Sequence, residues 1–164
     1  MENKVFRKLL NTENDYILTL ARLVLGVVFF AHGAQKMLGW FGGYGFEATM
    51  TGFMHEGIPA IFAFLAICAE FFGSIGLVSG FLTRIAAFGI ACVMSVAITM
   101  HIHNGFFMNW TGSQKGEGIE YHLLALAVSV LLMARGAGAL SLDHMLGRQP
   151  QEHKAHRREL VFNR

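Results

Sequence analysis

Four long stretches of apolar residues divide the chain, and shorter polar or glycine-containing segments separate them. The stretches run over residues 17–38, 59–82, 84–102 and 119–134. Each holds roughly 16–24 residues, and an α-helix needs about 20 to cross the hydrocarbon layer of a membrane. Helices are expected because a spanning chain must satisfy its backbone hydrogen bonds internally. The pattern predicts an all-α integral membrane protein, built as a four-helix bundle.

The segments between and around these stretches complete the predicted organisation. Residues 1–16 form a polar N-terminal segment, residues 17–143 the four-helix transmembrane domain, and residues 144–164 a polar, basic tail. Within the first connection, residues 39–58, four apolar side chains recur at helical spacing: Phe46, Met50, Phe53 and Met54. This spacing predicts a short helix that lies at the membrane interface.

The distribution of Lys and Arg predicts the orientation. An even number of spans places both termini and the turn at 80–84 on one side. That side carries ten of the thirteen basic residues, and the opposite side carries only Lys36 and Lys115, with Arg22 inside the first span. The positive-inside rule therefore predicts cytoplasmic termini, for a multi-pass protein of the bacterial inner membrane.

Composition narrows the classes further. Hydrophobic residues make up 54% and charged residues 15% of the 164 residues, against about 25% charged residues in soluble domains. The net charge is only +2 and the basic residues gather near the ends, so the expected partner is the lipid bilayer and nucleic acid is excluded. Cys68 and Cys92 lie in apolar runs without a CxxC pair, which indicates two small core residues.

One carboxylate and one guanidinium lie deep in the predicted spans. Straight helices place Arg22 about 8 Å and Glu70 about 15–18 Å above the cytoplasmic boundary. A buried carboxylate must be paired, hydrogen-bonded or protonated. Arg22 from below and His32 from above are nearest in height, which predicts a structural ion pair between Arg22 and Glu70. The alternative is that Arg22 extends to the membrane boundary.

Several spans also contribute polar residues to one layer near the outer boundary. His32 lies at about 22 Å, His101 and His122 at about 25 Å, and Lys36 and Glu120 at about 28 Å. His32 and Lys36 are four residues apart and therefore share a helix face. The alternative is that these residues are polar only because they lie where the spans meet water.

A quinone headgroup fits this layer better than a metal or haem. It needs hydrogen-bond donors at the membrane boundary, which His32, Lys36 and Tyr44 can supply, and Glu70 can take a proton. His101 and His103 point about 200° apart on a helix, and the chain has no HExxH motif, so a metal site is not expected. Bis-histidine haem, with two of His32, His101 and His122, stays open as a weaker alternative.

Small residues follow one ridge of the second stretch: Ala69, Gly73, Gly76 and Gly80. Such ridges let helices approach closely. The ridge therefore indicates packing within the bundle, with a homodimer face as the alternative.

Three segments together resemble the DoxX family of small four-span bacterial membrane proteins. They are ARLVLGVVFFAHGAQKMLGWFGG (21–43), AEFFGSIGLVSGFLTRIAA (69–87) after a GIPA start, and GIEYHLLALAVSVLLMARGAGALSLD (118–143). The resemblance implies a four-helix bundle associated with redox chemistry, because relatives include the membrane part of a thiosulfate:quinone oxidoreductase and partners of oxidant-defence enzymes. The positions similar to the family's polar pattern are Arg22, His32, Gly33, Lys36, Glu70, Arg84 and Glu120.

These observations favour a quinone-interacting subunit of a redox or oxidant-defence system. His32, Lys36, Tyr44, His101 and His122 are the candidate cofactor-binding residues. Glu70 and Glu120 are the candidate catalytic residues, which would move protons. A soluble redox protein is an expected partner, because the chain shows no electron carrier of its own. The alternatives are a non-enzymatic membrane anchor or scaffold for such partners, and a small transporter or proton channel.

Overall fold

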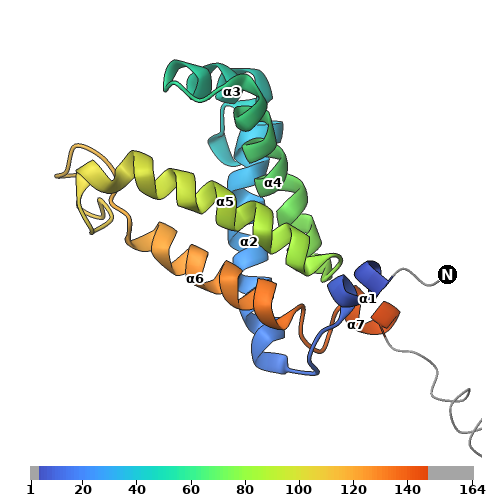
Figure 1. Cartoon of the computed structure of the whole chain (residues 1–164). Helices are drawn as coiled ribbons and strands as arrows, with labels where there is room; N and C mark the ends of the chain where they lie inside the picture. The colour runs from blue at the N-terminus through green and yellow to red at the C-terminus, as the bar shows by residue number, and fades with distance from the viewer. Residues whose placement is uncertain (1–3, 148–164) are drawn as a thin grey trace, which may run out of the picture.

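The computed structural model describes residues 4–147. All secondary structure in this part of the chain is helical, and it has no strand. Four helices are long: α2 (Tyr16–Leu38), α4 (Ala60–Ser79), α5 (Thr83–His101) and α6 (Glu120–Arg135). Shorter helices are α1 (Lys4–Leu10), α3 (Gly45–His55) and α7 (Leu142–Gly147), with 3₁₀ turns at Trp40–Gly42 and Ile102–Asn104. Figure 1 shows α3 at one end and α1 with α7 at the other.

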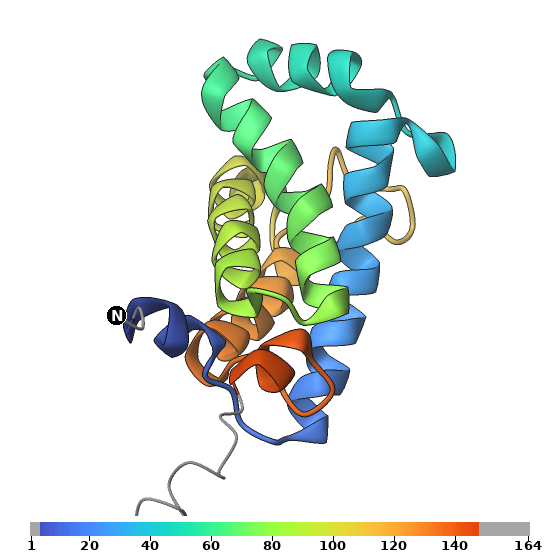
Figure 2. The same ribbon diagram turned by 90° about the vertical axis from the view of Figure 1, so that its right-hand side faces the viewer.

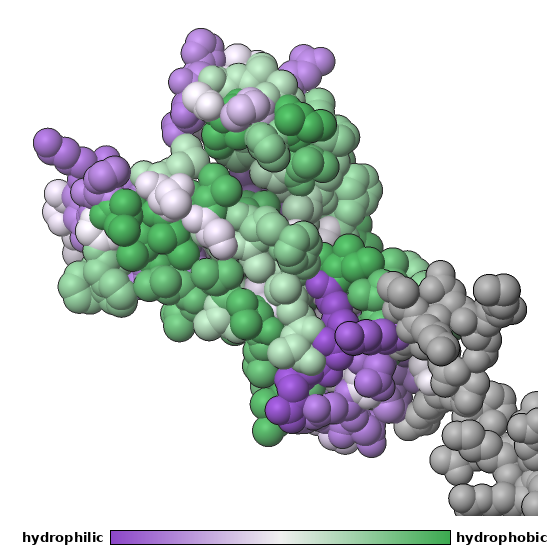
Figure 3. All heavy atoms as spheres, in the orientation of Figure 1, coloured by the Kyte–Doolittle hydropathy of each residue, from purple (hydrophilic) through white to green (hydrophobic). Residues whose placement is uncertain are grey.

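Three helical segments are long and apolar enough to cross a membrane: Tyr16–Leu38, Ala60–Ser79 and Thr83–Asn104. Helix α6 has 16 residues, which gives a length of about 24 Å against a hydrocarbon thickness of about 30 Å. Figure 3 shows hydrophobic surface over the long helices and hydrophilic surface gathered toward the ends. The predicted basic tail lies mostly outside the described residues, since only its first four residues fall within them.

Local sequence signals explain where the long helices begin and end. The Asp15 carboxylate accepts hydrogen bonds from the Ile17 and Leu18 amides at 2.7 and 3.3 Å, which caps the start of α2. Gly39 and Gly80 follow α2 and α4 in the left-handed conformation, with φ of 72° and 69°, where glycine is favoured. The bounds of the four predicted ranges agree with those of α2, α4, α5 and α6 to within three residues.

Close packing joins α2 to α4. A Cβ atom built on Gly33 would lie 2.7 Å from the Phe71 backbone, and one on Gly26 would lie 2.9 Å from the Val78 side chain. Only glycine permits this approach of the two helices. Helices α5 and α6 pack against each other, and in Figures 1 and 2 they diverge from α2 and α4.

The small-residue ridge of α4 packs within the chain. Gly73 and Gly76 face Ala86 of α5, and Gly80 lies against Ser141 and the guanidinium of Arg22. The ridge thus serves the packing that the sequence favoured, and these contacts occupy the proposed homodimer face.

Arg22 is only 1% exposed and ties together the end of the bundle that carries α1 and α7. Its guanidinium donates hydrogen bonds to four carbonyls: those of Ala137 (2.8 Å), Val78 (2.9 Å), Leu140 (2.5 Å) and Leu77. Two of these carbonyls belong to the last turn of α4, which a helix leaves unpaired. Arg22 therefore caps α4 and fixes the segment after α6.

Asp143 of α7 caps α5 in a similar way. Its carboxylate accepts hydrogen bonds from the Leu82 and Thr83 amides at 2.7 and 2.9 Å. Asp143 is 1% exposed, and α7 also contacts α1. Sequence analysis placed no helix at α1 or α7 because both segments are short and polar, and tertiary contacts stabilise them.

Candidate functional site

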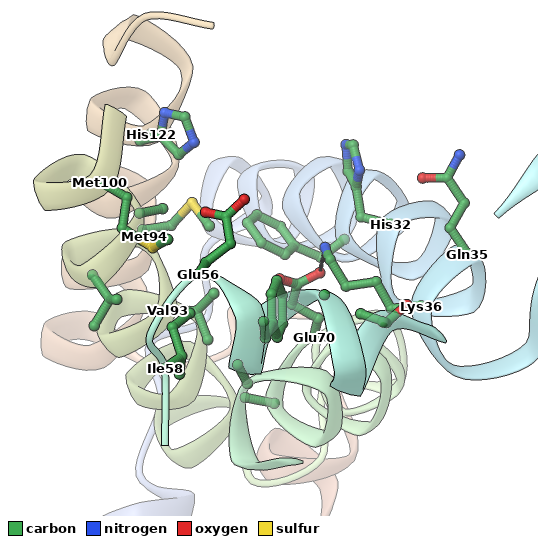
Figure 4. Close-up of a pocket in the computed structure, with 18 of the residues that line it drawn as sticks. His32, Gln35, Lys36, Glu56, Ile58, Glu70, Val93, Met94, Met100 and His122 are labelled. Carbon is green, nitrogen blue, oxygen red and sulfur yellow. Dashed lines mark hydrogen bonds and ion pairs between the residues drawn. The ribbon is translucent and has the colours of Figure 1, made fainter. Parts of the chain in front are cut away.

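A cavity of about 1040 Å³ lies where the two pairs of long helices diverge. Helices α2 and α4 form one wall, α5 and α6 form the other, and residues of α3 line it as well. Most of its lining is apolar, with polar side chains on both walls. Figure 4 shows His32, Lys36 and Glu70 on one side and His122 with Met100 across from them.

A buried ion pair marks the first wall. The Lys36 ammonium donates a short hydrogen bond to Glu70 Oε2. The Glu70 side chain is 4% exposed and that of Lys36 is 26% exposed, so the pair is largely removed from solvent yet reaches the cavity. The predicted ion pair between Arg22 and Glu70 is therefore corrected: Glu70 pairs with Lys36, and Arg22 bonds to backbone carbonyls.

The close approach of α2 and α4 sets this pair. Gly33 lies against the backbone of Glu70 and Phe71, and Lys36 follows three residues later on the same face. Side chains on a helix tilt toward its N-terminus, so Lys36 reaches back along α2 to the deeper Glu70. The straight-helix estimate compared backbone heights only, and this is why it separated the two residues.

The second wall holds a group of rings. His101 and His122 stack with centroids 4.9 Å apart, and Tyr121 lies 5.6 Å from His122 and 6.1 Å from His32. Tyr121 thus connects the histidine pair to the first wall. The Tyr121 hydroxyl and His122 Nδ1 are buried without a hydrogen-bond partner. Such orphaned groups are costly in an apolar interior, which makes them the natural binding groups for a polar ligand.

The structure gathers all five candidate cofactor-binding residues around the cavity: His32, Lys36, Tyr44, His101 and His122. Tyr44 is highly exposed at the rim, whereas His122 is buried. His101 has one ring nitrogen occupied, since Nδ1 lies 2.8 Å from the Ala97 carbonyl oxygen. The predicted convergence of polar groups from several helices therefore appears in the structure.

Glu120 does not line the cavity. Its carboxylate accepts hydrogen bonds from the Met108 amide at 3.0 Å and from Trp110 Nε1 at 2.9 Å. It thus orders the connection between α5 and α6. The structure places Glu120 beside the cavity lining and not in it.

Sequence analysis did not name five polar residues that line the cavity: Gln35, Thr49, Glu56, Glu117 and Tyr121. Tyr121 directly precedes His122 near the start of a span, where a tyrosine normally indicates the membrane interface. Cys92 also differs from expectation, because it is exposed and lines the cavity, whereas Cys68 is half-buried. A single cysteine in an apolar run carries no signal that separates these two environments.

The site and fold define a helical membrane protein with a charged pair in a cavity between its long helices, and comparison with known proteins gives its family. A profile of the DoxX family matches residues 17–104, more than half of the chain. The chain belongs to the DoxX family, as its sequence segments indicated. Lys36 and Glu70 lie inside the matched range, and Tyr121 and His122 lie beyond it.

Curated relatives extend the match over most of the chain. "Putative oxidoreductase CatD" of Bacillus subtilis is 29% identical over 76% of this chain and 82% of its own. "Inner membrane protein YqjF" of Escherichia coli is 27% identical over 82% of this chain and 95% of its own. "Inner membrane protein YphA" of the same organism is 29% identical, over 77% and 88%. No solved structure shows a significant match.

Proposed function

We propose that this chain is a multi-pass protein of the bacterial inner membrane that binds a quinone headgroup in its cavity. Helices α2, α4, α5 and α6 are the four spans, α3 lies at the outer interface, and both termini are cytoplasmic. The excess of Lys and Arg on the side of the termini supports this orientation. Two relatives described as inner membrane proteins support the location.

The convergence of polar groups in an otherwise apolar cavity carries this proposal. A quinone presents two carbonyl oxygens, which accept hydrogen bonds, on a flat apolar ring. Lys36 supplies an ammonium, the Tyr121 hydroxyl is a buried donor without a partner, and His122 can donate from Nδ1 when that nitrogen carries the proton. Donors thus stand on both walls, which fits a ligand with two acceptors.

The ion pair provides the acid–base group that the redox chemistry of quinones requires. When bound, a quinone supplies two-electron chemistry coupled to the uptake or release of two protons. Glu70 is the carboxylate in the cavity wall, paired with the Lys36 ammonium, and it is the group placed to exchange these protons with the headgroup. A soluble redox partner brings the electrons, and the chain is then the membrane subunit of a redox or oxidant-defence system. The relative named as an oxidoreductase supports this role.

The buried end of the bundle favours a binding site over a conducting path. A layer of side chains that are each at most 1% exposed closes the bundle at the end that carries α1 and α7. These residues are Arg22, Leu77, Thr83 and Asp143. A quinone that approaches from one side needs no path through this layer, whereas a proton channel does.

Quinone titration of the purified protein in detergent tests the proposal. The informative variant is the double substitution Lys36→Met with Glu70→Gln, because it removes both charges and leaves no unpaired ion in the bundle. We expect it to weaken quinone binding by about tenfold or more, the loss of one charge-assisted hydrogen bond. Lys115→Met, in the exposed connection before α6, is the matched control and should leave the affinity unchanged. Wild-type affinity in the folded double variant would overturn the assignment.

A further inference from the structure

One side of the cavity opens between α4 and α5. Five residues on the facing ridges of these helices both line the cavity and are exposed: Phe62 and Leu65 of α4, and Phe88, Cys92 and Val96 of α5. Phe62 and Leu65 are three residues apart, and the α5 residues are four apart, so each set lies on one helix face. A residue that is both lining and exposed marks a mouth of the cavity. We call this opening the α4–α5 slot. A second mouth beside α2 and α3 is marked in the same way by His32, Tyr44, Ala48, Gly52 and Glu56.

The α4–α5 slot runs along the membrane region at the depth of the ion pair. Glu70 and Cys92 each lie nine residues from the turn that joins α4 to α5, which places both about 13 Å from that turn. On α5 the lining extends from Phe88 to His101, a length of about 20 Å. Helices α4 and α5 touch beside Glu70, where a Cβ atom built on Gly89 would lie 3.2 Å from that of Ala69. The slot therefore opens on the outer side of this contact, between Leu65 and Cys92.

Another part of the cavity boundary is formed by α3, whose residues Ala48, Thr49, Gly52 and Phe53 line it. In Figure 1 this helix lies across the end of α2 and α4. The mouth beside α2 and α3 is thus bordered partly by polar residues and glycine, whereas the slot is bordered by apolar side chains. Figure 3 shows mostly hydrophobic surface over α4 and α5.

We infer that the α4–α5 slot is the passage for the long isoprenoid tail of a membrane quinone, an inference that rests on the proposed quinone site. The headgroup lies at Lys36 and Glu70, and the tail leaves between Cys92 and Leu65 into the bilayer. The ligand class is therefore a lipid-soluble quinone that enters sideways from the membrane. In the bilayer an isoprenoid tail is already in apolar surroundings. The slot therefore adds little attraction for the tail, and its role is to leave room for it.

Filling the slot tests this inference. Cys92→Trp places a large ring in the opening, and Ser95→Trp, an exposed position of α5 outside the cavity, is the matched control. Binding is measured in lipid nanodiscs for two compounds with the same headgroup, one with a long isoprenoid tail and one with a methyl group instead. The wild type and Ser95→Trp should bind both compounds. Cys92→Trp should weaken binding of the tailed compound by about tenfold, the effect of overpacking a filled site, and leave the tail-free compound unchanged.

Each result separates the two proposals. Failure of the wild type to bind either compound would remove the quinone site and the slot inference together. Binding of the tail-free compound alone by the wild type would overturn only the slot inference. An equal effect of Cys92→Trp on both compounds, or no effect on either, would also overturn only the slot inference. No effect on either compound is the result expected if a phospholipid chain occupies the slot.

The thiol of Cys92 gives a second measurement that needs no bulky substitution. In a Cys68→Ala variant, a membrane-dissolved maleimide should label Cys92, since its side chain is exposed at the slot. The tailed quinone should slow this labelling, and the tail-free compound should slow it much less. Equal protection by both compounds, or none by the tailed one, would overturn the inference.

Discussion

Breaking the Lys36–Glu70 pair from one side should destabilise the protein more than removing both charges. Lys36→Met leaves the Glu70 carboxylate, 4% exposed, without its counter-ion. Breaking a buried ion pair in this way costs about 3–5 kcal/mol. Lys36 is 26% exposed at the cavity, and water that reaches the carboxylate there lowers the cost, so we expect about 3 kcal/mol.

The double variant Lys36→Met with Glu70→Gln isolates this effect. It replaces both ions by neutral groups of similar size, and such replacements of buried pairs are often close to neutral, within about 1 kcal/mol. Lys36→Met and Glu70→Gln should each lower the free energy of unfolding, and the double variant should recover most of the loss. The double-mutant cycle then gives a coupling of about 2 kcal/mol or more.

Unfolding in mixed micelles, with increasing sodium dodecyl sulfate and helicity followed by circular dichroism, measures this cycle. Lys115→Met again controls for the loss of a lysine from an exposed segment. If the losses of the two single variants simply add in the double variant, the pair is not coupled, and the description of the site as a buried ion pair is wrong.

Three further substitutions test the packing and capping that hold the site. Arg22→Met removes four hydrogen bonds to the carbonyls of α4 and of the segment after α6 and should cost at least about 3 kcal/mol, whereas Arg135→Met, whose ion pair with Glu13 is exposed, should leave the free energy of unfolding close to that of the wild type in the same assay. Gly33→Ala places a Cβ 2.7 Å from the Phe71 backbone and should cost about 1–3 kcal/mol and weaken quinone binding; Gly52→Ala on α3, with open space around it, is the control for stability and should keep the wild-type free energy of unfolding. Asp143→Ala removes the cap of α5 and should cost about 2 kcal/mol, and Asp143→Asn, which keeps one carbonyl acceptor, should cost less when both are measured by unfolding.

The long helices could be predicted because their signal is strong and local. An apolar run of about 20 residues has few alternatives to a helix in a membrane, and Asp15, Gly39 and Gly80 mark helix ends by side-chain and backbone preferences of their own. Helices α1 and α7 carry no such run. They depend on contacts between distant parts of the chain, and Leu10 at the end of α1 is buried with 3% exposure.

The site could be predicted as a set of residues, but its pairings could not. Polar residues inside apolar runs indicated His32, Lys36, Glu70, His101 and His122, all of which line the cavity. Which groups pair depends on helix tilt and on side-chain direction, and backbone heights contain neither. This is why Arg22 was matched to Glu70 in place of Lys36. Glu120 lies at a similar predicted height, yet the fold of the preceding connection turns its carboxylate toward Trp110.

The molecule that occupies the cavity can be identified in the protein as it is purified from its membrane. A reduced-minus-oxidised ultraviolet–visible difference spectrum, taken in mild detergent, detects bound quinone without any added ligand. The wild type should show a quinone band near stoichiometric occupancy, and the folded Lys36→Met, Glu70→Gln double variant should lose it. A quinone band of equal size in both proteins, or a Soret band in place of it, would contradict the assignment of the Lys36–Glu70 cavity as a quinone site.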